Sequence, residues 1–156
     1  MLEGCKSAQE RWGGVHEIID RWLAQRSVLI KGLVGLCEHD KFTPTDTPFI
    51  QHVCEQLVDY VSVGHFEVYE QLAIEAEAFH DDTALIRFKE LMPDIQETTE
   101  VAVEFNDKFD TSDHCNAELA ELPFALQALS VVMAERFALE DQLIKELHEA
   151  HSEKSA

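Results

Sequence analysis

The stretch Leu57–Glu70, LVDYVSVGHFEVYE, lies within a helical pattern that begins near Pro48. At about 100° per residue, one side of this helix is an apolar stripe typical of a core face. The stripe consists of Ile50, Val53, Leu57, Val61, Gly64, Val68 and Leu72. The opposite side carries Asp59, Ser62, Val63, Phe66 and Glu70, so a valine and a phenylalanine stand among polar residues. A helix with apolar residues on both sides is either enclosed in the fold or presents one face to a partner.

The size and charge of the chain limit the classes of function. Its 156 residues predict one domain, spanning residues 1–156, with enough chain to bury a core. Its formal net charge is −19. Nucleic acids and anionic membranes are bound through Lys and Arg, so this charge argues against either as a direct partner. A basic protein surface fits the charge better, and solubility alone is the other explanation.

The cysteines and the N-terminus indicate the compartment. Cys5, Cys37, Cys54 and Cys115 form no CxxC pair, which favours free thiols in a reducing compartment over a disulfide framework. The N-terminus has no apolar segment of the secretory type, and no apolar run reaches the ~18 residues of a membrane span. We therefore expect a cytoplasmic protein.

Helical periodicity extends over most of the chain. Expected helices cover Ser7–Cys37, Pro48–Ala78, Thr83–Lys108 and Ala117–Ala150. Gly13 and Gly14 are expected to loosen or break the first turns of the first helix, and Pro93 to kink or interrupt the third. Thr47 before Pro48 resembles an N-cap followed by proline at the first helical position. No segment alternates with the period of a strand, so the expected fold is an all-α, up-down antiparallel four-helix bundle.

Metal and catalytic sites find little support in the sequence. Glu77–His80 is the only Glu-x-x-His pair, and it falls at a helix end. His16 and Asp20, together with His65, are a fragment of the histidine set that a hemerythrin-like bundle needs, so a hemerythrin-like metal-binding bundle stays as the alternative. Surface or hydrogen-bonded core histidines explain the same residues without a metal. No phosphate-binding loop or nucleophile motif is present, so we expect no metal, no cofactor and no enzymatic activity.

Charged residues beside aromatic ones occur in the first and last expected helices. Asp20, Arg21 and Arg26 surround Trp22, and the pairs Glu135-Arg136 and Glu140-Asp141 occur in the last helix. In one interpretation these charges form salt bridges between helices, with the arginine stems packed on apolar residues. In the other, Trp22 and its neighbours line a groove for a partner, since Trp and Arg are common interface anchors.

Three segments resemble one family when taken in order. They are IIDRWLAQR at 18–26, FIQHVCEQLVDYVSVGHFEVYEQL at 49–72 and ERFALEDQLIKELHEAH at 135–151. Together they resemble the Rsd/AlgQ family of bacterial anti-sigma factors, and the opening LEGCKSAQERWGGVHEIIDRWL is most similar to the AlgQ branch. The most specific combination is LVDY-x-S-x-GHF-x-x-YE with a downstream ERF-x-LED. The resemblance is weakest in the third expected helix and the loop after it.

The resemblance implies an all-helical anti-sigma factor without catalytic activity. Such a protein binds region 4 of the primary sigma factor one to one and hinders its association with RNA polymerase core and −35 promoter DNA. The acid, serine and phenylalanine that matter for binding in the family match Asp59, Ser62 and Phe66. Val63 stands where the family pattern has a smaller alanine, a change expected to alter the contact without abolishing it. The family allows for further regulatory protein partners, which none of these residues identifies.

The expected sigma-binding surface combines the resemblance with the periodicity. It comprises Asp59, Ser62, Val63, Phe66 and Glu70 on the second helix, with Trp22 on the first helix as the neighbour expected to complete it. Phe66 is expected to be the desolvated anchor and Asp59 a charge partner for Arg or Lys. An adaptor that uses this face for a different protein remains a further alternative.

Overall fold

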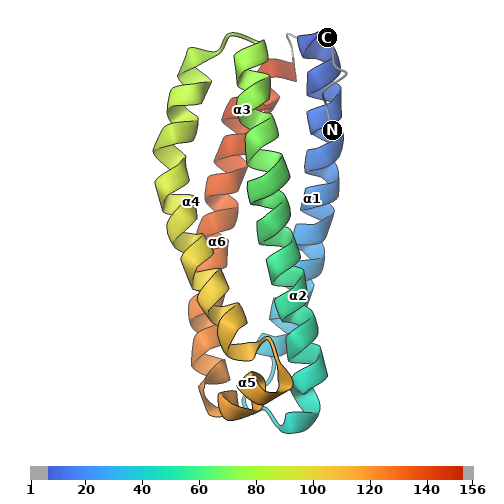
Figure 1. The fold of residues 1–156 in the computed structure, drawn as a ribbon, viewed down its shortest axis with the longest axis vertical. Helices are drawn as coiled ribbons and strands as arrows, with labels where there is room; N and C mark the ends of the chain where they lie inside the picture. Colours follow the sequence, from blue (N-terminus) through green and yellow to red (C-terminus); the bar gives the residue numbers. More distant parts are fainter. Residues whose placement is uncertain (1–6, 153–156) are drawn as a thin grey trace.

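Four long rods make up most of the computed structural model, which describes residues 7–152 (Figure 1). The helices are α1 (Ala8–Cys37), α2 (Thr47–Val63), α3 (Tyr69–Ala78), α4 (Asp82–Phe109), α5 (Ser112–Ala117) and α6 (Leu122–Leu147). A π turn, Gly64–Val68, joins α2 to α3, so these two helices form one rod. Within residues 7–152 there is no strand. The predicted all-α, up-down four-helix bundle is confirmed.

The rods alternate in direction around the bundle (Figure 1). The first rod, α1, packs against the α2–α3 rod and against α6, and α4 packs against the same two neighbours. The short helix α5 lies at the end where α2 begins and α4 ends. Consequently the outer side of α2 lies between α1 and α4, where it is open to solvent.

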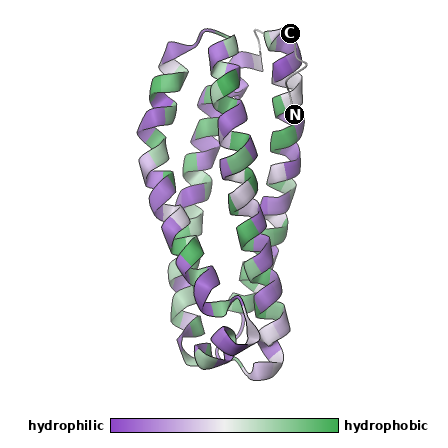
Figure 2. Cartoon of the chain, in the orientation of Figure 1, coloured by the Kyte–Doolittle hydropathy of each residue, from purple (hydrophilic) through white to green (hydrophobic). Residues whose placement is uncertain are grey.

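Amphipathic helices bury their apolar stripes between the rods. Green hydrophobic and purple hydrophilic residues alternate along each rod in Figure 2, as this arrangement requires. Every member of the stripe predicted in the second helix is buried, from Ile50 to Leu72. This continuous core leaves the opposite side of α2 free for another role.

Several helix ends differ from expectation because of local capping. Ser7, expected to be the first helical residue, is the N-cap of α1, and its Oγ accepts a hydrogen bond from the Glu10 N–H at 3.2 Å. Thr47 is the first residue of α2 rather than its cap, because a capped 3₁₀ turn at Pro44–Asp46 precedes the helix. The Thr47 hydroxyl instead donates to Asn116 Oδ1 at 2.9 Å. Part of the loop expected after the third helix folds into α5, whose N-cap is Thr111.

Neither the glycine pair nor the internal proline breaks its helix. α4 runs as one helix from Asp82 to Phe109, so the interruption expected at Pro93 does not occur. Pro93 and Lys89, whose carbonyl loses its helical partner, are both exposed, so water can satisfy that carbonyl. α1 likewise continues through Gly13 and Gly14, because Trp12 on this stretch donates to the His148 carbonyl and anchors it to α6.

Three of the four cysteines lie within the described residues. Cys37, Cys54 and Cys115 are free, and burial raises the pKa of Cys54 to about 12. Cys5 lies outside the described residues. By length and hydropathy alone, the segment Leu119–His151 could span a membrane. In the bundle, however, α6 directs Leu126, Leu129 and Met133 into the core and carries the buried charges of Arg136 and Glu140.

Candidate functional site

The predicted face of α2 is on the surface. Phe66 is 81% exposed, an unusual exposure for so large an apolar side chain. Asp59 is exposed, and Ser62 and Val63 are half-buried. We call Asp59, Ser62, Val63 and Phe66 the α2 face. It combines an apolar centre with a carboxylate and a hydroxyl, which is a composition suited to binding protein.

Two grooves flank the α2 face and extend it onto both neighbouring helices. The groove toward α1 has a volume of about 320 Å³ and is lined by Asp59, Gln56, Gln25 and Val28 among others. The groove toward α4 is smaller, about 180 Å³. Its lining includes Val58, Val61, Ser62, Val103 and Asn106. Val28, Val58 and Val103 are all exposed, so both grooves add apolar surface beside Asp59 and Ser62.

Glu70 is exposed, but the π turn changes its position around the rod. In an uninterrupted α-helix Glu70 would lie about 20° from Asp59. The π turn contains one residue more than an α turn, so Glu70 instead lies about 20° from Ser62, on the side of α4. The prediction of 100° per residue, which placed Glu70 on the side of Asp59, therefore fails after the π turn.

Trp22 lies in the core, so it does not line the groove as expected. Its side chain is 1% exposed and stacks on Tyr60, with ring centroids 4.9 Å apart. Its Nε1–H donates to the Tyr60 carbonyl at 3.1 Å. Trp22 therefore supports the α2 face from beneath, and Val28 and Gln25 are the α1 residues beside Asp59. Without local unfolding, Trp22 does not reach a partner.

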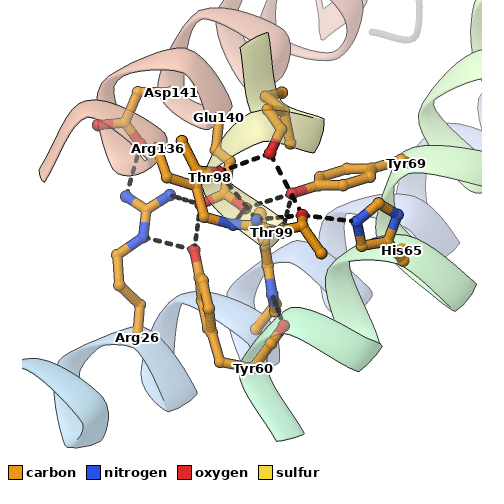
Figure 3. A network of polar contacts seen from close by, with 11 residues as sticks. Arg26, Tyr60, His65, Tyr69, Thr98, Thr99, Arg136, Glu140 and Asp141 are labelled. Atoms are coloured by element: carbon orange, nitrogen blue, oxygen red, sulfur yellow. Dashed lines mark hydrogen bonds and ion pairs between the residues drawn. The ribbon is translucent and has the colours of Figure 1, made fainter. Parts of the chain in front are cut away.

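A buried polar network lies beneath the α2 face, centred on Glu140 of α6 (Figure 3). Tyr60 donates to Glu140 Oε1 and Tyr69 to Glu140 Oε2, each at 2.5 Å. Arg26 Nε donates to the Tyr60 hydroxyl, and Arg136 donates to the Tyr69 hydroxyl, both at 2.9 Å. Each carboxylate oxygen thus has one tyrosine, and each tyrosine has one arginine.

The two arginines complete the network and balance its charge. Arg136 lies 3.2 Å from Glu140 with both side chains fully buried, and Arg26 lies 3.4 Å from Glu140 and 2.6 Å from Asp141. The Arg26 guanidinium also lies over the Phe137 ring, 4.8 Å from its centroid. Burial raises the pKa of Glu140. Its partners, two guanidinium groups and two tyrosine hydroxyls, act in the opposite direction because they stabilise the ionised carboxylate. Salt bridges between helices, one of the two interpretations of these charges, are therefore present.

A second buried polar cluster lies just beyond the C-terminal end of α6. Glu75 of α3 lies 2.6 Å from His148 Nδ1 and 2.8 Å from His151 Nδ1, and His151 Nε2 lies 2.9 Å from Asp81. His148 Nε2 also lies 3.1 Å from His16 Nδ1. Burial raises the pKa of Glu75 to about 7 and lowers that of His148 to about 4. These contacts fasten the segment 148–151, after α6, to α1, α3 and the start of α4.

The Glu75 carboxyl predicts a pH-dependent difference between the wild type and Glu75→Gln. A raised folded-state pKa gives stability that is present at low pH and is lost as pH rises from about 4.5 to about 7. The free energy of unfolding of the wild type, relative to Glu75→Gln, should therefore be larger at about pH 5.5 than at about pH 8, by about 2 kcal/mol. Urea unfolding of both proteins at the two pH values measures this. A difference that does not change with pH would contradict the assignment.

The described residues do not bring the histidines together around a metal. His16 stacks with Trp12 and His148, and His65 Nε2 lies 3.0 Å from Thr99 Oγ1. Among residues 7–152, no three His, Cys, Asp or Glu side chains are grouped as ligands of one metal ion. The hemerythrin-like alternative therefore gains no support from the geometry.

A further apolar groove, of about 510 Å³, lies between α1 and α6. It is lined by Ile30, Val34, Met133 and Phe137 among others, and Val34 is more than half exposed. None of its lining residues belongs to the α2 face. Among the described residues, this groove is an apolar surface separate from the α2 face, and it contains none of the predicted binding residues.

Sequence reasoning missed several parts of the site. Val28 and Val103 could have been found by the signal that revealed Phe66, an apolar residue off the core stripe. The contacts of Tyr60 and Tyr69 with Glu140 join residues far apart in the chain, so no local pattern shows them. The burial of His148 and His151 was also missed, because both stand near the chain end, where helices usually fray.

Comparisons with known proteins identify the family of this chain. The family model described as "Regulator of RNA polymerase sigma(70) subunit, Rsd/AlgQ" matches residues 1–148. A regulator of sigma D from Pectobacterium atrosepticum is 33% identical over 155 residues, covering 96% of this chain and 99% of that protein. One from Yersinia pseudotuberculosis is 31% identical over 152 residues, covering 93% of this chain and 88% of the relative. No solved structure gives a significant match.

Proposed function

Because this chain belongs to the Rsd/AlgQ family of regulators of the RNA polymerase sigma(70) subunit, we propose that it binds region 4 of the primary sigma factor, one to one, through the α2 face. Its partner is then a protein, and its activity is binding without catalysis. The contact residues in this proposal are Asp59, Ser62, Val63 and Phe66, with Glu70 at the edge toward α4. Since sigma factors work in the cytoplasm, the protein acts there.

The exposed phenylalanine is the observation that carries the proposal. Phe66 is 81% exposed four residues after Ser62, and Asp59 and Ser62 line the grooves toward α1 and α4. An aromatic anchor ringed by polar groups is the usual anatomy of a binding hot spot. The same three residues match the family's sigma-binding acid, serine and phenylalanine.

The chemistry of region 4 is complementary to this surface. Region 4 reads DNA through a helix-turn-helix, so it presents basic residues for phosphate contacts. A net charge of −19 attracts such a surface over long range and speeds the encounter. On contact, Phe66 inserts between apolar side chains of region 4, and Asp59 pairs with a basic residue at the rim. Because the same basic surface serves DNA, one region 4 cannot hold this protein and the −35 element together.

A competition experiment tests the functional consequence. Labelled primary sigma factor is mixed with RNA polymerase core and a −35 promoter fragment, and this protein is then added in increasing amounts. We expect holoenzyme and its promoter complex to decrease as a complex of this protein with sigma forms. A sigma factor that lacks region 4 is the control and should form no such complex. Equal capture of the truncated sigma factor would contradict the assignment to region 4.

A further inference from the structure

The π turn Gly64–Val68 brings two tyrosines to one carboxylate. In an uninterrupted α-helix, Tyr60 and Tyr69 would point about 180° apart. The π turn, in which the Tyr69 N–H bonds to the Gly64 carbonyl, reduces this angle to about 80°. Both hydroxyls can then reach Glu140, one on each oxygen. The carboxylate therefore holds the rod on both sides of the irregular turn.

The inner side of the turn is filled by aromatic rings. A Cβ atom added at Gly64 would lie 3.2 Å from Trp22 Cζ2 and 3.2 Å from the Tyr69 hydroxyl. A side chain at this position would push one of these rings away. Trp22 in turn is fixed by its bond to the Tyr60 carbonyl. Glycine thus allows the turn to approach Trp22 and Tyr69 closely.

The side of the turn toward α4 is held by a separate chain of contacts. His65 Nε2 lies 3.0 Å from Thr99 Oγ1, and Thr99 accepts a bond from Arg136 at 2.7 Å. Burial, together with the nearby Arg136 charge, lowers the pKa of His65. Arg136 is the same residue that bonds to Glu140 and to Tyr69. Phe66 is the middle residue of the turn, and its side chain is exposed to solvent.

We propose that Glu140 is a positioning residue for partner binding, because it locks the π turn that presents Phe66. Glu140 is fully buried and does not touch a partner. If the turn relaxed to a regular α-helix, the residues after it would rotate by about 100° relative to Asp59 and Ser62. Glu70 would then leave the side of α4, and Phe66, which lies inside the turn, would rotate by part of that angle. This inference rests on the proposed function, since it takes Phe66 as the contact.

Tyr69→Phe tests the lock with the smallest change. The ring stays packed, but the hydroxyl that ties the far side of the turn to Glu140 is lost. Affinity for isolated region 4 is measured for the wild type, Tyr69→Phe, Phe66→Ala and the double variant. We expect Tyr69→Phe to weaken binding about 10-fold alone and less than about 2-fold in the Phe66→Ala background. Equal losses in both backgrounds, or no loss in either, would overturn the proposal.

A control and a partner-free measurement separate the lock from general stability. Phe109→Leu, a core change at the far end of α4, lowers stability without touching the π turn and should leave the affinity unchanged. Amide hydrogen exchange at residues 65–69 should be faster in Tyr69→Phe than in Phe109→Leu. Glu140→Gln, in which an amide NH₂ replaces one acceptor oxygen, should behave as Tyr69→Phe does.

A failure of the proposed function can be distinguished from a failure of the proposed role of Glu140. If the wild type does not bind region 4, the proposed function fails. The exchange data still decide the lock, and unchanged exchange in Tyr69→Phe and Glu140→Gln would overturn it.

Discussion

Replacing Phe66 by alanine is expected to weaken binding to region 4 by about 2 kcal/mol or more, a loss of about 30-fold, while the fold stays intact. Phe66 is 81% exposed in the free protein, so its removal leaves no cavity in the core. In the complex its ring would be desolvated at the centre of the interface, where truncations cost most. Calorimetric titration measures the affinity, and circular dichroism checks the fold.

Phe124 supplies the matched control for this prediction. It is also an exposed phenylalanine, at 78%, but it lies at the start of α6, outside the α2 face. Phe124→Ala removes the same chemical group and should leave affinity unchanged. A loss of binding free energy below about 0.5 kcal/mol for Phe66→Ala would show that Phe66 is not the anchor of the interface. Loss of binding in Val34→Lys alone would move the site to the groove between α1 and α6.

Removing the Glu140 side chain is expected to cost about 3 to 5 kcal/mol in the free energy of unfolding. Glu140→Ala leaves Arg136 fully buried without its carboxylate and leaves the hydroxyls of Tyr60 and Tyr69 without their acceptor. An uncompensated buried charge is among the largest single causes of destabilisation. Urea unfolding monitored by circular dichroism measures the loss.

Asp141, the acid next to Glu140, is expected to contribute much less to the free energy of unfolding. Asp141 also pairs with Arg26, at 2.6 Å, but its side chain is 61% exposed. Asp141→Ala should cost no more than about 1 kcal/mol, because water screens and replaces the lost partner. Equal losses for the two variants would show that burial does not control the strength of this network.

The core and the exposed anchor were predictable because both depend on local periodicity. The part of the stripe from Ile50 to Gly64 needs only the 3.6-residue period, and Phe66 stood out as an apolar residue on the opposite side. The four rods followed from the same signal. Pro93 did not interrupt α4, because the cost of a helical proline falls when the freed carbonyl is exposed to water.

The parts that were not predictable depend on contacts between distant segments. Trp22 has the chemistry of both a core residue and an interface anchor, and only its packing on Tyr60 distinguishes them. The π turn exists where Glu140, from the last helix, meets two tyrosines of the second rod. His148 and His151 are buried because the topology places them beside Glu75. Each of these features depends on contacts that exist only when the four rods are packed together.

Calorimetric titration of the purified 156-residue chain with isolated region 4 of the primary sigma factor tests the central claim most directly. The account predicts saturable binding at one region 4 per chain. It also predicts that raised salt slows association, because ions screen the attraction of the −19 charge. Absence of binding by the wild type, at low salt and with both proteins folded, would contradict the account.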